Sequence, residues 1–455
     1  MLSRSLPPVF VLLILAFANG CSSGGGTLAR GLQGVLPAAS SPTGSTGGKI
    51  QHVIIVVQEN RSFESFFAGY PGANAPMVGW GKNSQNQRIK IPLKKITFGQ
   101  SANLLHSWSA AMRMWDNGQM DGFSAFGQPG AHQAYSYVNQ TQLAPYWTMA
   151  KQYVLADEMF PTEFGPSYTA HMTLIAGTDN LSRTQALVDF PSHPPMDCDA
   201  PPGTTSTFVD QYRIVYWRLG PFPCYTQFKT MADTLDAAGL SWKYYETSIL
   251  NAGIWAPFEA IANVRYGPYY FKDISAPPFN VLKDIQNGNL ANVSWVTPTK
   301  EDSDHPGLGT DRGPSWSGAI VNAVGQSKYW DSTAIVIVWD EWGGQYDNVP
   351  PPQLDFRGLG IRVPCLIISP YAKQNYVSHT IYEWGSILKF VEQVFGLPAL
   401  GSAQDGYTDA RANSLIDSLN FNQSPRRFKT IPTKYKIQDF TSEPPSVMRV
   451  PVDDE

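Results

Sequence analysis

The sequence predicts an α/β fold in which helices cover both faces of a large, mostly parallel β-sheet. Two observations lead to this prediction. Several short apolar runs rich in β-branched residues are continuous rather than alternating, which is the pattern of strands buried on both faces. Segments with helical spacing of apolar residues separate these runs, and strands that alternate with helices form a sheet covered on both sides.

Four runs predict strands of this sheet, and two segments predict helices. The strands are HVIIVV (52–57), VSWVT (293–297), TAIVIVWD (333–340) and PCLIISP (364–370). Residues 381–396 carry apolar side chains at helical spacing and end on Gly396, a common residue after a helix. Pro314 suits the first turn of the second helix.

Length and composition are those of a globular protein. The chain has 455 residues, enough for one large domain or two ordinary ones, with 43% hydrophobic and 15% charged residues. This composition excludes a disordered chain. A net charge of −4 without a stripe of Lys and Arg gives no electrostatic basis for a nucleic-acid partner.

The N-terminus predicts export. Residues 1–20 combine Arg4 with a short apolar stretch, as in a signal peptide, and Gly20-Cys21 resembles a lipoprotein processing site. An ordinary signal peptidase would cut at the same place. Two possibilities therefore stay open: Cys21 is lipidated and attaches the protein to a membrane, or Cys21 is unmodified. Residues 21–48 then form a flexible Gly/Ser-rich tether. We expect a protein of the periplasm or cell surface, either secreted or anchored as a lipoprotein.

The remaining chain is predicted as one domain, residues 49–430, followed by a C-terminal tail, 431–455. A loop- and aromatic-rich region within it, about 186–290, is expected to be an insertion that covers the functional site. Cys198 and Cys224 flank a Pro-rich stretch, and export makes a disulfide between them possible. Cys365 lies in a predicted buried strand and is expected to be an inert thiol.

Polar residues follow two of the predicted strands directly. Glu59 and Asn60 follow the first strand, and Asp340 and Glu341 end the third. Ligand sites of α/β sheets form where strand carboxyl ends meet loops. Each pair alone could be a solvated turn, but together they are hard oxygen donors, which favour one divalent ion such as Mg²⁺, Ca²⁺ or Mn²⁺ over a structural zinc.

A serine and several histidines are further candidates. Pro166 places Ser167 in the first turn of a helix, where the backbone favours anions such as phosphate. Ser167 could attack phosphorus if a metal lowered its pKa, or it could be an ordinary helix cap. His171 lies four residues on, on the same helical face. His106 and His305 could donate a proton or bind an anion, or could have no role.

Five segments resemble successive signatures of a bacterial phosphoesterase family that contains phosphatidylcholine-type phospholipases C and secreted acid phosphatases. They are QENRSFESFFAGYPG, DNGQMDGF, SDHPG, WDEWGGQYDNVPPP and RVPCLIISPYA, and the C-terminal DARANSLIDSLNFNQSPRRF is similar as well. The resemblance covers about 50–430. It implies an alkaline-phosphatase-like fold, a three-layer sandwich with a large mixed, mostly parallel sheet and a metal-assisted site at its strand ends.

The resemblance also implies roles for individual residues. Ser167 would be the nucleophile and, with the two acidic pairs, a ligand of one divalent ion, whose identity stays open among Mg, Ca, Mn and Zn. His305 or His106 would protonate the leaving group, and His106, His171 and Arg61 would contact the phosphoryl oxygens. The chain departs from the family pattern at Asn348, where relatives often carry His, and at Glu64, where they carry Asp.

The expected function is therefore an exported hydrolase of phosphoric esters with a phosphoserine intermediate. A phosphate monoester and a phosphodiester such as a phospholipid are both open as substrate. Asn348 motivates the alternative of a non-catalytic surface protein that binds a ligand on the same scaffold. A sulfatase-like hydrolase is disfavoured because the Cys/Ser-x-Pro-x-Arg segment of that chemistry is absent.

Overall fold

The computed structural model describes residues 46–127, 132–250 and 253–444. The predicted signal peptide and nearly all of the tether lie outside the described residues, as does the end of the predicted tail. Within the described ranges, no helix combines the length and the apolar character that a membrane crossing requires.

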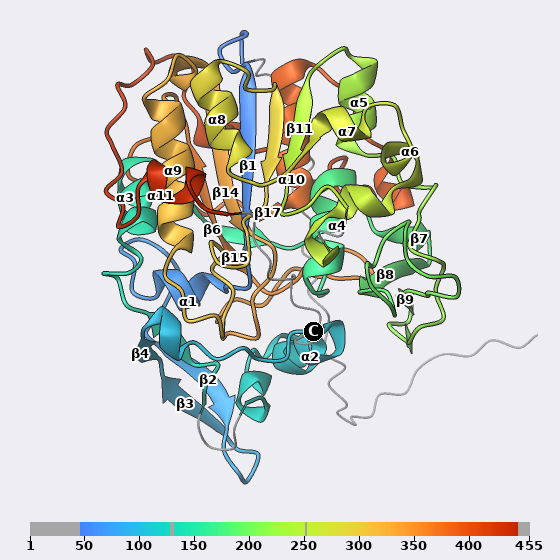
Figure 1. Ribbon diagram of the computed structural model, residues 1–455. Coiled ribbons are helices and arrows are strands. Elements are labelled where there is room, and N and C mark those ends of the chain that lie inside the picture. Colours follow the sequence, from blue (N-terminus) through green and yellow to red (C-terminus); the bar gives the residue numbers. More distant parts are fainter. Residues whose placement is uncertain (1–45, 128–131, 251–252, 445–455) are drawn as a thin grey trace, which may run out of the picture. The chain divides into compact units, whose positions relative to one another are not determined.

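The centre of the fold is one nine-stranded sheet (Figure 1). Its order is β12-β11-β13-β1-β14-β15-β6-β16, and β17 pairs with β6 as well. In the described sheet β15 is antiparallel to both of its neighbours, whereas the other pairs are parallel. The sheet is therefore mixed and mostly parallel, as predicted. Its strands are β1 (His52–Gln58), β6 (Val154–Phe160), β11 (Trp242–Tyr245), β12 (Ile274–Ser275), β13 (Val293–Val296), β14 (Thr333–Trp339), β15 (Val363–Ile368), β16 (Tyr376–Ser378) and β17 (Tyr382–Glu383).

The four predicted strands correspond to β1, β13, β14 and β15, and they form the buried middle of the sheet. Every residue of β13, β14 and β15 is buried, which explains why these strands read as continuous apolar runs. β1 and β14 pair in parallel from His52↔Thr333 to Gln58↔Trp339. This register brings the ends of the two strands side by side.

Helices pack on both faces of the sheet. One group consists of α3 (Ala144–Gln152), α8 (Asn280–Asn287) and α9 (Gly313–Gly325), which contact one another through α9. The other contains α4 (Ser167–Ala176) and α10 (Trp384–Phe395), which also touch each other. The indole nitrogen of Trp295 in β13 donates to the Leu174 carbonyl at 3.2 Å and so joins α4 to the sheet. The two predicted helices are α9 and α10.

The region 186–290 differs from the predicted insertion because part of it belongs to the main sheet. β11 pairs in parallel with β13, and β12 extends the sheet beyond β11. The rest contributes to a separate four-stranded antiparallel sheet. Its strands are β7 (Asn180–Ser182), β8 (Gln185–Asp189), β9 (Thr207–Asp210) and β10 (Val215–Tyr216), in the order β10-β9-β8-β7.

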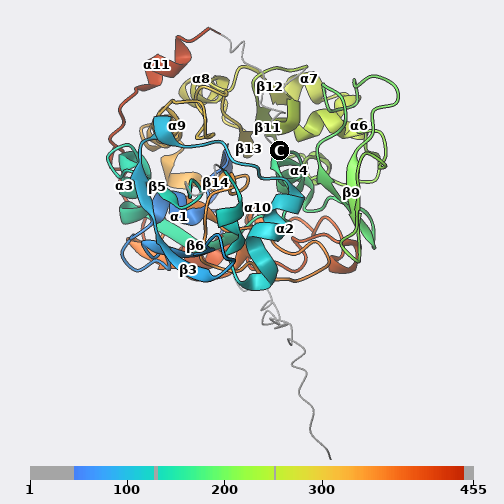
Figure 2. The same ribbon diagram turned by 90° about the horizontal axis from the view of Figure 1, so that it is seen from below.

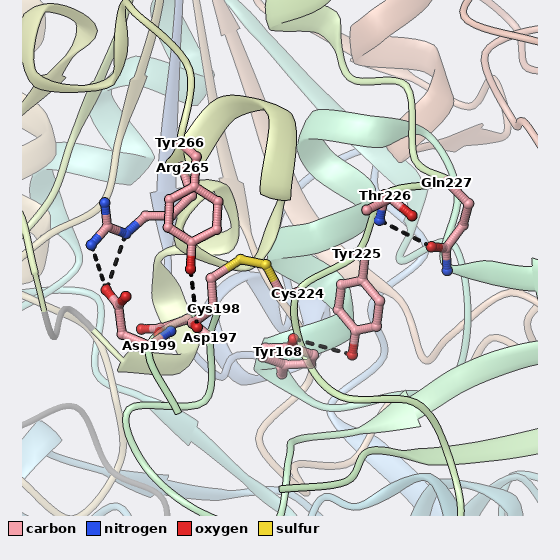
Figure 3. Close-up of a disulfide and its surroundings, with 10 residues drawn as sticks. All are labelled: Tyr168, Asp197, Cys198, Asp199, Cys224, Tyr225, Thr226, Gln227, Arg265 and Tyr266. Carbon is pink, nitrogen blue, oxygen red and sulfur yellow. Dashed lines mark hydrogen bonds and ion pairs between the residues drawn. A yellow bond between two sulfur atoms is a disulfide. The ribbon is translucent and has the colours of Figure 1, made fainter. Parts of the chain in front are cut away.

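The predicted disulfide is present. Cys198 and Cys224 are joined within the loops of this region, beside Tyr225 and Tyr266 (Figure 3). The Tyr266 hydroxyl donates to the Cys198 carbonyl at 3.3 Å. Cys365 is a buried free thiol in β15, and its burial raises its pKa. The bridge therefore links two loops that also pack against the core, since Tyr225 next to Cys224 is buried in it.

Smaller elements lie beyond the carboxyl end of the sheet, in the lower part of Figure 1 and facing the viewer in Figure 2. They include α1 (Phe63–Phe67), α2 (Trp108–Trp115) and a hairpin of β2 (Val78–Lys82) and β3 (Arg88–Pro92). The predicted tail instead packs elsewhere. Phe440 of α11 (Ile437–Thr441) is buried against Trp316 of α9.

Candidate active site

The candidate site begins where β1 and β14 end. The Asp340 amide donates to the Gln58 carbonyl at 2.9 Å, and the Arg61 amide donates to the Glu341 carbonyl at 2.9 Å. These bonds continue the strand pairing past both strand ends. Glu59, Asn60, Asp340 and Glu341 are consequently neighbours, and all four side chains are fully buried. Charged groups at this depth require compensation by a partner of opposite charge.

Three side chains form a group that could hold a metal ion. Glu59, His171 and Asp340 each direct one ligand atom into a space in which these atoms lie within 4.8 Å of one another. The His171 Nε2 atom is 3.2 Å from Glu59 Oε1 and 3.9 Å from Asp340 Oδ2. Two carboxylates and an imidazole suit a divalent cation.

A contact of the other ring nitrogen, Nδ1, with Tyr244 favours one tautomer of His171. The Tyr244 hydroxyl donates to the Trp255 carbonyl at 2.7 Å, so its oxygen is left to accept from His171 Nδ1 at 3.5 Å. Burial lowers the pKa of His171 to about 4, which keeps the ring neutral. Nε2 lies within hydrogen-bond distance of Glu59 Oε1. With the proton on Nδ1, the lone pair of Nε2 would be available to a cation between the two carboxylates, as outer partners orient metal-bound histidines.

Electrostatics in this group favour a bound cation. Burial raises the pKa of Asp340 well above its usual value, and the nearby Glu59 carboxylate raises it further. His171 and the Ser167 side chain act in the opposite direction on the same pKa. A divalent ion would remove the repulsion between the two carboxylates, so the residues present fit such an ion.

Ser167 lies beside Asp340, at the start of α4. Pro166 precedes it in an extended conformation, as the sequence predicts for a helix first turn. The Ser167 hydroxyl is buried and has no hydrogen bond of good geometry within the described residues, although it is close enough to lower the pKa of Asp340. Its position combines a helix N-terminus with the candidate metal group, which suits the binding of a phosphoryl group.

Asn60, His106 and Glu341 form an adjoining set. His106 Nδ1 donates to the Leu104 carbonyl at 2.6 Å, so its Nε2 accepts from the Asn60 side-chain amide at 3.1 Å. This pairing leaves the side-chain carbonyl oxygen of Asn60 available as a ligand for a cation. Glu341 is held by the Gly343 amide at 2.6 Å and lies 3.9 Å from His106 Nε2.

Backbone geometry explains the glycine in this set. Gly343 has a φ of +62°, and a Cβ atom there would lie 2.2 Å from the Asn60 carbonyl oxygen. Asn60 itself has a φ of +58°, which asparagine tolerates better than most residues. The turn after Glu341 therefore requires glycine to let the two strand ends approach each other.

His305 lies next to this set. Its ring centroid is 6.4 Å from that of His106 and 6.3 Å from that of Trp255. Burial, and then the nearby His106, lowers the pKa of His305 to about 3, while Nδ1 donates to the Pro306 carbonyl at 2.8 Å. The ring is therefore neutral without substrate, and the negative charge of a bound phosphoryl group would favour its protonation.

Arg61 is buried but engaged with protein groups. Its Nε donates to the Asp304 carbonyl at 2.8 Å and its Nη1 to Ser101 at 2.5 Å. Burial lowers the pKa of Arg61 to about 10. These contacts fasten the loop that carries His305, so the guanidinium holds this loop whether or not it also contacts substrate.

The two residues that depart from the family pattern, Asn348 and Glu64, both lie near the buried Asp347 and Arg362. The Asn348 side chain donates to Asn74 and accepts from Arg362, each at 3.0 Å. Asp347 is paired with Arg362 in the protein interior. Asn348 thus belongs to a structural network and supplies no titratable group. Burial, and then Asp347, raises the pKa of Glu64 well above its usual value.

Sequence reasoning located every one of its candidate residues in this region, and it assigned His171 to substrate rather than to the metal. Tyr244 and Trp255 were missed. They come from the region 186–290, and a tyrosine that orients a histidine through a 3.5 Å contact has no local sequence signal. The helical spacing of Ser167 and His171 was the signal that placed His171 near the site.

Comparisons with known proteins bear on the family of the chain. The model of the family described as "Phosphoesterase family" matches residues 50–398. Phospholipase C B of Mycobacterium tuberculosis (strain ATCC 25618 / H37Rv) is 25% identical over 446 residues, which cover 84% of this chain and 79% of that protein. Hemolytic phospholipase C of Pseudomonas aeruginosa is 26% identical over 410 residues, covering 76% of this chain and 53% of the relative.

Solved structures show more distant similarity. A protein in the alkaline phosphatase superfamily from Vibrio parahaemolyticus has a TM-score of 0.39 and 12% identity, with coverage of 82% of this chain and 71% of its own. Murine ectonucleotide pyrophosphatase / phosphodiesterase 5 has a TM-score of 0.38 and 9% identity, covering 61% of this chain and 95% of its own.

Proposed function

The chain belongs to the phosphoesterase family and is a hydrolase that acts on phosphoric ester bonds. We propose that it cleaves these bonds with Ser167 as the nucleophile beside a divalent ion. The observation that carries this proposal is the convergence of Glu59, His171, Asp340 and the Ser167 hydroxyl at the carboxyl end of β1 and β14. These residues come from three separate segments of the chain, and two of them are carboxylates buried close to each other.

Glu59, Asp340 and His171 would hold the ion. The family resemblance implies three further ligands, which are Asn60, Glu341 and Ser167. When bound, the ion supplies positive charge that favours the alkoxide form of Ser167 and stabilises charge on the phosphoryl oxygens. Which of Mg, Ca, Mn or Zn it is follows from the metal scan below.

The chain's own groups then divide the reaction. The Ser167 hydroxyl gives up its proton to water and attacks phosphorus in line. The new bond to phosphorus forms a phosphoserine as the bond to the leaving oxygen breaks, while the N-terminus of α4 binds the phosphoryl oxygens. His305 donates a proton to the departing alkoxide, or His106 does so. The Asn60 amide occupies His106 Nε2, which leaves His305 as the better donor. Water finally hydrolyses the phosphoserine.

The substrate class follows the relatives in part. The names of the curated relatives describe phospholipases C, which cleave phosphodiesters of lipids. We propose a phosphodiester or a monoester of this kind as substrate, including phospholipid. Export is proposed as well, because the Cys198–Cys224 disulfide suits an oxidising compartment and the N-terminal residues match a signal peptide.

The test measures hydrolysis of p-nitrophenyl phosphate and of p-nitrophenyl phosphorylcholine by the purified chain, with each divalent metal in turn. Ser167→Ala should lower kcat by at least about 10³-fold. Thr173→Ala is the matched control, since Thr173 is a buried hydroxyl on the same helix that donates to the Ala170 carbonyl. Unchanged turnover in Ser167→Ala would refute the nucleophile. If wild type hydrolyses neither ester with any metal, the alternative of a non-catalytic binding protein is favoured.

A further inference from the structure

Two exposed segments flank the candidate site and differ in character from the rest of the surface. The first, which we call the aromatic tip, comprises residues 211–222 around β10. The second, the basic hairpin, comprises residues 77–95 and contains β2 and β3. Neither segment contributes to the proposed chemistry. The first exposes a group of large apolar side chains, and the second exposes a group of positively charged ones.

The aromatic tip exposes large apolar side chains. Tyr212 is 76% exposed, Leu219 is 71% exposed and Trp217 is 54% exposed, and Ile214 and Phe222 are exposed beside them. Isolated apolar residues are common on protein surfaces, but five within twelve residues form a patch that calls for a partner. Trp, Tyr and Leu together are the residues that anchor proteins in the interfacial layer of a bilayer.

The basic hairpin adds a row of positive charges. Residues 77–95 contain five Lys and Arg and no Asp or Glu, in a chain whose net charge is −4. Lys82 and Arg88 form ion pairs with Asp116 and Asp121. For Lys90, Lys94 and Lys95, no carboxylate lies within ion-pair distance in the described part of the chain, and all three are exposed.

The two strands of the hairpin present Lys82, Arg88 and Lys90 on one face, and Lys94 and Lys95 follow in β4 (Lys94–Ile96). Gly79 and Gly81 turn inward, where Tyr346 and Tyr135 pack closely against them. The opposite face carries Trp80 paired with Lys90 and Val78 paired with Pro92. Lys90 Nζ lies 5.3 Å from the centre of the Trp80 ring. This face is apolar and cationic together, which matches an anionic lipid surface.

Contacts place both segments beside the site. The Trp80 amide donates to the Tyr346 hydroxyl at 3.0 Å, and Tyr346 belongs to the loop that follows Asp340 and Glu341. The Arg213 guanidinium of the aromatic tip lies 5.5 Å from the ring of Trp115, at the end of α2. Lys82 of the hairpin pairs with Asp116, the next residue. Both segments therefore adjoin the same end of α2, beyond the carboxyl end of the sheet (Figures 1 and 2).

We propose that the aromatic tip and the basic hairpin together form a docking surface for an anionic phospholipid bilayer. The apolar side chains of the tip insert among the lipid headgroups, and Lys90, Lys94 and Lys95 contact the anionic ones. The surface would hold the site near its ester at the membrane. Only this last role, which concerns the ester substrate, rests on the proposed function. Lipid binding itself is measured without turnover and can be tested separately.

The experiment is co-sedimentation of the full chain with phosphatidylcholine vesicles, with and without phosphatidylglycerol, at low and high salt. All proteins carry Cys21→Ser, so that lipidation cannot contribute and the N-terminal segment is the same in each. The tip variant is Tyr212→Ser/Trp217→Ser/Leu219→Ser, and the hairpin variant is Lys90→Gln/Lys94→Gln/Lys95→Gln. The matched controls are Phe271→Ser, an exposed aromatic residue of α7 (Tyr270–Asp273), and Lys272→Gln/Lys283→Gln/Lys328→Gln.

The hairpin variant should bind anionic vesicles on the order of 100-fold more weakly, with no loss on neutral vesicles, and high salt should remove the difference. The tip variant should lose binding to both kinds of vesicle. Both should keep the circular dichroism and melting temperature of wild type, because the changed residues are exposed. If both variants sediment like the controls, the proposal is overturned. It is also overturned if the tip instead mediates a dimer, which light scattering would detect as a mass halved by the tip variant.

Discussion

The strongest consequence of the site geometry concerns Asp340. Its Oδ1 accepts hydrogen bonds from the Asn60 and Glu341 amides, both at 2.8 Å, and its Oδ2 lies 3.9 Å from His171 Nε2. Asp340→Asn keeps the shape and the acceptor at Oδ1, and replaces the second oxygen by an amide group near Glu59. The change therefore removes a proposed metal ligand and one buried ionisable group while the turn stays supported.

The two effects have opposite signs, which makes the prediction sharp. In chelator, Asp340→Asn should be as stable as wild type or more stable, since burial and Glu59 disfavour the carboxylate there. With a metal at about 100 times its dissociation constant, wild type should gain about 2.7 kcal/mol, and the variant should gain little. For a domain of roughly 400 residues, that gain raises the melting temperature by about 3 °C.

The assay is thermal unfolding in chelator and across a metal titration. Asp189→Asn is the matched control, because Asp189 is also buried, accepts an amide hydrogen bond from Phe190 at 2.8 Å and has a pKa raised by burial to about 7. This control should keep the full metal shift. The reasoning fails if metal stabilises Asp340→Asn as much as wild type, or if the variant unfolds several degrees below wild type in chelator.

Three further predictions follow from the site and the fold. Because burial and Glu59 raise the pKa of Asp340, protons should compete with the metal for this side chain. Below that pKa, metal binding should release a proton and weaken by up to about tenfold per pH unit as the pH falls. Titration calorimetry in two buffers of different ionisation enthalpy would show equal heats if no proton were released. His305→Gln should slow hydrolysis of an alkyl phosphate by about 10²–10⁴-fold and that of p-nitrophenyl phosphate much less, because p-nitrophenolate leaves without a proton. Equal losses on both substrates would exclude His305 as the acid. Replacing Cys198 and Cys224 by Ala should lower the free energy of unfolding by about 3 kcal/mol in denaturant titrations, whereas reductant should not destabilise that variant further.

The sequence predicted the middle of the sheet because burial on both faces leaves a local trace. β1 and β14 begin where their apolar runs begin and end within one residue of them. β11 left no such trace, since Lys243 interrupts it and its place in the sheet depends on pairing with β13, some fifty residues later. β12 has two residues and is defined only by its pairing with β11. For this reason the sequence did not separate the part of region 186–290 that joins the main sheet from the loops around it.

The candidate site could be predicted to a similar extent and for similar reasons. Strand ends are local features, so Glu59 and Asp340 were identifiable, and parallel pairing then brings them together. The distance between His171 and Glu59 depends instead on how α4 packs against β13 through Trp295. Nothing near His171 in sequence states that packing, and its role was therefore assigned to substrate binding.

The way in which the ligands are held bears on how the site can work. Asp340 is fixed by two backbone amides and Glu341 by one, while Tyr244 orients His171. These supports come from strand ends and a buried aromatic residue, which do not rearrange easily. A site built this way would have its geometry before an ion binds, with Glu59 and Asp340 held close enough for Glu59 to raise the pKa of Asp340. Preorganised charge of this kind is what stabilises a transition state. The energetic cost of the metal-free site and its proposed catalytic capacity thus have the same structural origin.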